Sequence, residues 1–209
     1  MRLFIAVQLP AEVQAKIAEI REDLSRAAQR EKADIKWVQP EQFHFTLKFL
    51  GECPDEQLPG ITEALKTAVE GVAPFSLRLG SLGAFPEKGS LRVIWVGLLE
   101  GDPPLRALAE RVEAACELLG FPQEERLFHA HVTLGRGRGS KNMAKMRAHI
   151  EAKKIEPMGP LAVHSITLVR STLSPKGPMY TDLQEFELPT SPPRSPRRPG
   201  PSPDRRGKA

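Results

Sequence analysis

The tetrapeptides His44-Phe45-Thr46-Leu47 and His131-Val132-Thr133-Leu134 share one pattern, and 87 residues separate their histidines. Both lie in stretches where apolar and polar residues alternate. Successive side chains of a β-strand point to opposite faces, so each His shares a face with its Thr. The sequence therefore predicts two strands that each present an imidazole and a hydroxyl on one face.

The segments that precede the two tetrapeptides also match. An apolar strand, a helix opened by proline and a His-x-Thr-Leu strand occur in this order over residues 3–47 and again over residues 91–134. Pro10 and Pro103 stand where proline is favoured, at the first turn of a helix. This duplication predicts an α+β fold with two pseudo-symmetric lobes, whose mixed or antiparallel sheets flank a central cleft that carries both motifs.

Hydrophobic periodicity predicts the other elements. Strands are expected at residues 3–9, 34–38, 43–50, 75–82, 91–99, 129–135, 161–173 and 180–188. Helices are expected at residues 10–24, 56–70, 102–120 and 142–152.

The last twenty residues differ in composition from the rest. Residues 1–189 are expected to form one domain with both lobes and one cleft. Residues 190–209 contain six prolines and no apolar anchor, so we expect a disordered Pro- and Arg-rich tail. Two roles are open for this tail: a solvated extension, or an electrostatic aid in holding RNA.

The basic pI of about 9.2 comes from the tail. Residues 190–209 hold six Lys and Arg and one Asp, a net +5, while the whole chain is +4, so residues 1–189 sum to −1. Bulk charge is therefore no argument that the domain binds nucleic acid. No apolar run approaches the ~20 residues of a membrane span, and the N-terminal run is too short for a signal peptide. We expect a cytoplasmic monomer.

The paired motifs suit acid/base chemistry on a phosphate. Histidine, with an ordinary pKa of about 6.5, serves either as acid or as base. Thr46 and Thr133 can donate hydrogen bonds to phosphoryl oxygens, and Arg136 can clamp an oxygen through two N–H groups. A strained cyclic phosphate has a reactive leaving group, so neither a metal nor another cofactor is expected.

Both motifs, extended to Gly51 and Arg136, resemble the paired signatures of the 2H phosphoesterase superfamily. They are most similar to those of the bacterial RNA 2′,3′-cyclic phosphodiesterases, formerly called 2′-5′ RNA ligases. The similarity covers most of residues 1–188 and includes the opening residues 2–7 and the late segment 168–180.

The resemblance implies hydrolysis of RNA 2′,3′-cyclic phosphate ends to 2′-phosphomonoesters, with weak 2′-5′ ligation in reverse. It implies that His44 is the general acid and His131 the general base, and that Thr46, Thr133 and Arg136 hold the phosphate. The expected partner is an RNA with a cyclic phosphate end, such as a tRNA fragment, or a nucleotide. His129 and Ala130 depart from the family's usual basic residue and proline, which puts contacts to RNA at the rim in doubt.

Several alternatives stay open. The substrate could be a small nucleotide, such as a cyclic phosphate of ADP-ribose or an oligoadenylate, and a non-catalytic RNA-binding role ranks last. His129 and His131 together have the spacing of two metal ligands, although no third ligand is spaced to join them. Phe49 either packs inward or stacks on a base if the strand bends, and Lys48 either faces the cleft or is solvated.

Overall fold

The computed structural model describes residues 1–175 and 177–190. The predicted disorder of the tail concerns residues that, from 191 onward, lie outside this range. The strands are β1 Arg2–Gln8, β2 Ile35–Trp37, β3 His44–Glu52, β4 Phe75–Phe85, β5 Val93–Glu100, β6 His131–Gly137, β7 Met158–Val163, β8 Ser165–Ser174 and β9 Gly177–Glu187. The helices are α1 Ala11–Glu31, α2 Leu58–Val69, α3 Asp102–Glu117 and α4 Met143–Ala152, with 3-10 turns at Pro40–Gln42 and Asp55–Gln57.

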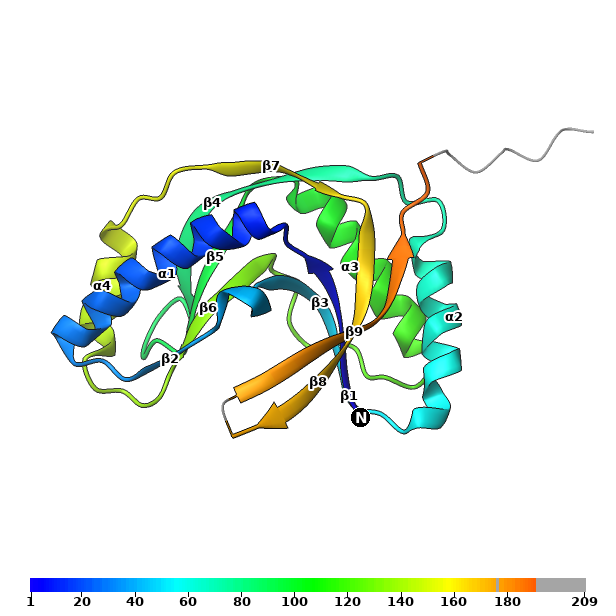
Figure 1. Ribbon diagram of the computed structural model, residues 1–209, viewed down its shortest axis with the longest axis horizontal. Coiled ribbons are helices and arrows are strands. Elements are labelled where there is room, and N and C mark those ends of the chain that lie inside the picture. The colour runs from blue at the N-terminus through cyan, green and yellow to red at the C-terminus, as the bar shows by residue number, and fades with distance from the viewer. Residues whose placement is uncertain (176, 191–209) are drawn as a thin grey trace, which may run out of the picture.

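The strands form one curled sheet in the order β7-β4-β5-β6-β3-β1-β8-β9, and β2 pairs with β6 outside this path (Figure 1). Every pairing between these strands is antiparallel. The predicted α+β class and its two related lobes are confirmed. The lobes are two halves of one sheet, and β3 meets β6 where the halves join.

The internal duplication appears in the topology. Around the β3–β6 junction, β1 corresponds to β5 and β8 to β4, while α1 corresponds to α3 and α2 to α4. The helices lie in two pairs at opposite ends of the molecule, α1 with α4 and α2 with α3 (Figure 1). Each pair covers one half of the sheet, since α4 packs on β4 and α3 packs on β3.

The predicted strand over residues 161–173 is two strands in the structure. The chain turns at His164, so that β7 pairs with β4 in one half and β8 pairs with β1 in the other. Only His164 and Ser165 separate the apolar residues of β7 from those of β8, and this short polar pair did not mark a break in the sequence pattern.

Alternation along β1 shows how the sheet separates its two faces. Leu3, Ile5 and Val7 enter the main core beneath the helices, whereas Phe4 and Ala6 form a small separate cluster with Val169. We call the face that carries Phe4 the inner face. Burial of each large apolar side chain contributes about 1.5–3 kcal/mol, so this alternation fixes which face the helices cover.

Matching bulges interrupt both motif strands. Leu47 is an extra residue where β3 pairs with β1, followed by a second one at Leu50, and Leu134 is the extra residue where β6 pairs with β5. A bulge shifts the side-chain alternation by one residue. Phe49 is therefore turned to the inner face, where it lies 6.0 Å from the ring of Phe4 and is 58% exposed. Lys48 is turned toward the helices.

Neither expectation for Lys48, an inner-face position or a solvated end, agrees with the structure. Lys48 is 2% exposed, and its Nζ donates to Glu113 Oε1 of α3 at 2.5 Å and to the Pro122 carbonyl at 2.8 Å. Glu113 Oε1 also accepts the backbone N–H of Glu124 at 3.0 Å. This network ties β3 to the loop that leads into β6 and hence to His131.

We predict that Glu113→Ala destabilises the protein by about 3 kcal/mol, because it strips a buried ammonium of its countercharge. Lys48→Met, which removes the charge and keeps an apolar stem, should cost less. The free energy of unfolding in urea measures both. Glu63→Ala, which breaks the exposed ion pair with Lys66, is the control and should cost less than about 1 kcal/mol. An equal loss in Glu113→Ala and Glu63→Ala would contradict a structural role for the buried pair.

Candidate active site

The two His-x-Thr-Leu strands lie side by side at the junction of the sheet halves. Phe45 pairs with Val132, and the two strands run antiparallel. One step to either side of this pair, the register sets His44 against Thr133 and Thr46 against His131. Both histidines and both threonines are half-buried, while the apolar residues between them are fully buried in the core.

The His44 imidazole is held by its own strand. Its Nδ1 lies 2.7 Å from the carbonyl oxygen of Gln42, and its Nε2 lies 3.0 Å from Thr46 Oγ1. A carbonyl oxygen only accepts, so Nδ1 carries a proton and donates. In the neutral ring Nε2 is then unprotonated and accepts from the Thr46 hydroxyl. Proton exchange at this residue therefore takes place at Nε2.

The His131 imidazole is held in the same way. Its Nδ1 lies 2.7 Å from the carbonyl oxygen of His129, which is again the residue two positions earlier. Nδ1 therefore donates here as well, and Nε2 is the atom that exchanges a proton. Two imidazoles with the same tautomer and the same kind of backbone partner lie on adjacent strands.

Burial lowers the pKa of both imidazoles. The pKa of His44 falls to about 4, chiefly through loss of solvent; the Gln42 carbonyl raises it and the charge of His131 lowers it further. Loss of solvent also lowers the pKa of His131, with the His129 carbonyl opposing and the charges of His129 and Arg136 assisting. Both histidines are therefore neutral near pH 7 when no anion is bound.

Arg136 reaches the inner face because of the bulge at Leu134. It occupies the place in β6 that Phe49 occupies in β3, five residues after the histidine. Its side chain is exposed, and its charge acts on two groups of the site, lowering the pKa of His131 after burial and opposing the effect of burial on the pKa of Tyr180. A guanidinium in this place can receive a phosphate oxygen beside the imidazoles.

Aromatic rings flank each histidine. Phe4 stacks on His44 with 4.8 Å between ring centroids, and Tyr180 meets the same imidazole edge-on at 5.5 Å. On the other side, Phe85 lies 5.2 Å from His131.

Trp95 lies 4.8 Å from His129, beside the second motif. A Cβ on Gly83 would meet the Trp95 indole at 2.3 Å, so only glycine lets this ring lie flat on β4. Phe4, Phe85 and Trp95 were not predicted from the sequence as neighbours of the site. Their only signal was alternation with residues that enter the core.

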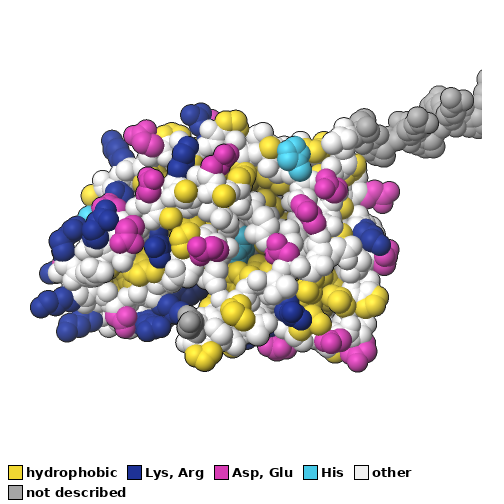
Figure 2. Space-filling model, in the orientation of Figure 1, with side chains coloured by type: hydrophobic (Ala, Val, Ile, Leu, Met, Phe, Trp, Pro, Cys, Tyr) yellow, Lys and Arg dark blue, Asp and Glu magenta, His cyan; other side chains and the backbone are white. Residues whose placement is uncertain are grey.

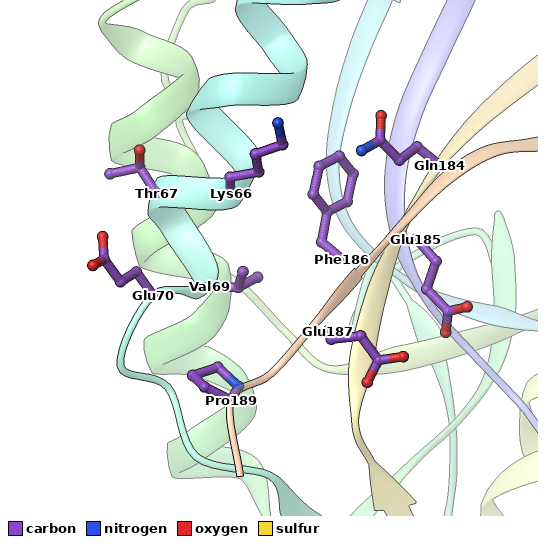
Figure 3. Close-up of a pocket in the computed structure, with 9 residues that line it drawn as sticks. All are labelled: Lys66, Thr67, Val69, Glu70, Gln184, Glu185, Phe186, Glu187 and Pro189. Carbon is purple, nitrogen blue, oxygen red and sulfur yellow. The ribbon is translucent and has the colours of Figure 1, made fainter. Parts of the chain in front are cut away.

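The pocket in Figure 3 lies away from the two His-x-Thr-Leu motifs. It lies between α2 and β9, and Val69, Phe186 and Pro189 share its wall with Glu70, Glu185 and Glu187. Neither His44 nor His131 lines it, and its three carboxylates outnumber its one lysine, Lys66, so its net negative charge would repel a phosphate. The candidate site is instead the inner face at the β3–β6 junction.

The structure also bears on metals and membranes. Within residues 1–175 and 177–190, no three His, Cys, Asp or Glu side chains are grouped so that they could hold a metal ion. The pair formed by His129 and His131 thus has no third ligand there. In the same part of the chain, no helix has both the length and the apolar character needed to cross a bilayer.

A family model and several relatives of known name all match this chain to one family. The family described as LigT like Phosphoesterase matches residues 7–95 and 98–180. An RNA 2′,3′-cyclic phosphodiesterase of Thermus thermophilus is 38% identical over 197 residues, covering 90% of each chain. One of Archaeoglobus fulgidus is 36% identical over 187 residues, covering 90% of this chain and all of the relative.

Solved structures agree. A crystal structure of a Thermus thermophilus protein superposes with a TM-score of 0.71 at 36% identity, covering 90% of this chain and 98% of the other. Escherichia coli LigT complexed with 3′-AMP superposes with a TM-score of 0.65 at 28% identity, covering 90% and 97%. This chain belongs to the LigT-like phosphoesterase family, within the 2H group of enzymes.

Proposed function

We propose that this protein hydrolyses RNA 2′,3′-cyclic phosphate ends to 2′-phosphomonoesters without a metal. The observation that carries the proposal is the antiparallel juxtaposition of two imidazoles, each fixed through Nδ1 so that Nε2 exchanges protons. The relatives of this chain, named RNA 2′,3′-cyclic phosphodiesterases, support the substrate class. One chain carries both histidines, so a monomer suffices for the chemistry.

In the proposed mechanism, His131 Nε2 takes a proton from a water molecule as the water oxygen attacks phosphorus. The bond from phosphorus to the ribose 3′ oxygen breaks, and His44 Nε2 delivers its proton to that oxygen. The products are a 3′ hydroxyl and a phosphate on the 2′ oxygen. Each proton transfer is worth roughly 10²- to 10⁴-fold in rate.

The remaining polar groups hold the phosphate. The Thr46 and Thr133 hydroxyls donate to non-bridging oxygens, and Arg136 balances the charge that develops on them. Read in reverse, the same site joins a cyclic phosphate to a 5′ hydroxyl through a 2′-5′ bond, and the two histidines exchange roles. A small cyclic nucleotide is the second candidate substrate, since these five residues engage only the terminal phosphate.

We expect His44→Ala and His131→Ala each to lower kcat on an oligoribonucleotide with a 2′,3′-cyclic phosphate end. The loss should be at least about 100-fold, because each variant removes one proton transfer. The assay contains EDTA, and phosphorus NMR identifies the product. His164→Ala removes an exposed histidine at the turn between β7 and β8, so it serves as the matched control and should keep full activity. Wild-type activity that needs added metal, or activity that survives either substitution, would exclude the mechanism.

The lowered pKa values predict the pH dependence. The protonated form of His44 is lost as pH rises through its pKa of about 4, and the neutral form of His131 is lost as pH falls through its own lowered pKa. We therefore expect kcat/KM, which reports the free enzyme, to peak below about pH 6.5 and to fall at higher pH.

The kcat profile should lie at higher pH, because a bound phosphate anion favours the imidazolium forms. Measuring both profiles on a cyclic mononucleotide separates the two effects. A kcat/KM profile that is still rising at pH 7 would contradict the assignment.

A further inference from the structure

The two halves of the molecule carry opposite charge at equivalent places. From Arg136 to Lys154, the segment that follows the second motif holds seven Lys and Arg and one Glu. The segment that follows the first motif, residues 49–71, holds five Asp and Glu and one Lys. The duplicated topology makes these segments counterparts, because each leaves a motif strand and forms the next helix.

Several exposed cations converge where β6 ends. Lys36 pairs in register with Arg136, and beyond it Arg138 donates its backbone N–H to the carbonyl of Asp34 at 2.9 Å. Asn142 Nδ2 donates to the carbonyl of Lys32, which brings the loop before α4 onto the end of α1. We call this region the basic end; its members are Lys32, Lys36, Arg92, Arg138 and Lys141.

The basic end is free to meet a ligand. Its five side chains are exposed, and within the described part of the chain none of them forms an ion pair or a side-chain hydrogen bond. Figure 2 shows Lys and Arg side chains gathered at the end of the molecule that holds α1, α4 and β2, with Asp and Glu side chains among them and over the rest of this face. Two acidic residues adjoin these five: Asp34, opposite Arg138, and Glu31, which pairs with Lys145 of α4.

The basic end continues from the candidate site. His131, Thr133, Arg136 and Arg138 follow one another along β6 and its extension, so cations extend away from the phosphate position in one direction. In the other direction, the segment after β3 is acidic and repels a polyanion.

We infer that the RNA strand upstream of its cyclic phosphate leaves the site along β6 and lies on the basic end. This inference rests on the proposed function and adds the path of the substrate. The cyclic phosphate occupies the 3′ end, so the phosphates on its 5′ side are those that meet Lys36, Arg138 and Lys141. Because a mononucleotide lacks these upstream phosphates, the protein should act more efficiently on an oligonucleotide than on a mononucleotide.

The test compares two triple variants that remove the same charge. Lys36→Gln/Arg138→Gln/Lys141→Gln changes the basic end. The control variant changes three exposed cations outside the basic end, each of which has an acidic partner: Arg2→Gln/Lys66→Gln/Arg78→Gln. Both are assayed on a 12-nucleotide RNA with a 2′,3′-cyclic phosphate end and on a cyclic mononucleotide, over a series of KCl concentrations.

We expect the basic-end variant to lose about tenfold in the ratio of oligonucleotide to mononucleotide kcat/KM. Its plot of log affinity against log salt should become shallower by about 2, since each contact to single-stranded RNA contributes about 0.7. The control variant should keep both values. Equal losses in the two variants, or an unchanged ratio and slope in the basic-end variant, would overturn the inference.

Binding separates this inference from the proposed function. Fluorescence anisotropy with a 12-nucleotide RNA that ends in a 3′ phosphate measures affinity without turnover. If the wild type fails to hydrolyse cyclic phosphates, the proposed function fails, while the anisotropy comparison of the two variants still decides the path. If hydrolysis proceeds and both variants bind alike, the path alone is wrong.

Discussion

The pairing of Phe45 with Val132 is the contact on which the site depends. It joins two halves of a sheet that otherwise have their own strands and their own helix pair. Antiparallel register at this point sets each histidine opposite the threonine of the other motif. A slip of one residue in either strand would turn the histidine and threonine of that strand into the core and expose its Phe45 or Val132, so core burial and site geometry enforce the same register.

The bulges at Leu47 and Leu134 refine this arrangement. Without them, strict alternation would place Lys48 on the inner face and Phe49 in the core. With them, Phe49 and Arg136 come to the inner face at equivalent places, one apolar and one charged. The duplicated frame thus holds different chemistry at these two equivalent places: the ring of Phe49 on the side of His44, and the cation of Arg136 on the side of His131, which leads to the basic end.

Much of the fold and the site was predictable from local patterns. Period-two alternation located β1, β3 and β6, and the repeated strand, helix and strand predicted the two related halves. The grouping of His44, His131 and their threonines followed from that repeat. Roles for these residues stay predictions that need the kinetic tests above.

The features that could not be predicted from the sequence have specific physical causes. A bulge leaves no mark on composition, so the place of Lys48 could not be derived and that of Phe49 stayed open. The turn at His164 is marked only by the polar pair His164-Ser165 between two apolar stretches. Partners far apart in the chain, such as Lys48 with Glu113 or Phe4 with His44, are set by packing and not by spacing. The net charge of residues 1–189 gave no sign of the basic end, because acidic segments in the other half of the molecule cancel its positive charge.

Burial of the imidazoles also bears on how the products leave. Hydrolysis converts a monoanionic diester into a phosphomonoester whose second pKa is near ~6, so the product carries up to one more negative charge than the substrate. A site with permanently charged imidazoles would hold that dianion more tightly than its substrate. Because burial lowers both imidazole pKa values, the histidines give up their protons readily at neutral pH and the attraction weakens. The same desolvation that keeps the resting imidazoles uncharged therefore weakens the hold of the site on its dianionic product at neutral pH.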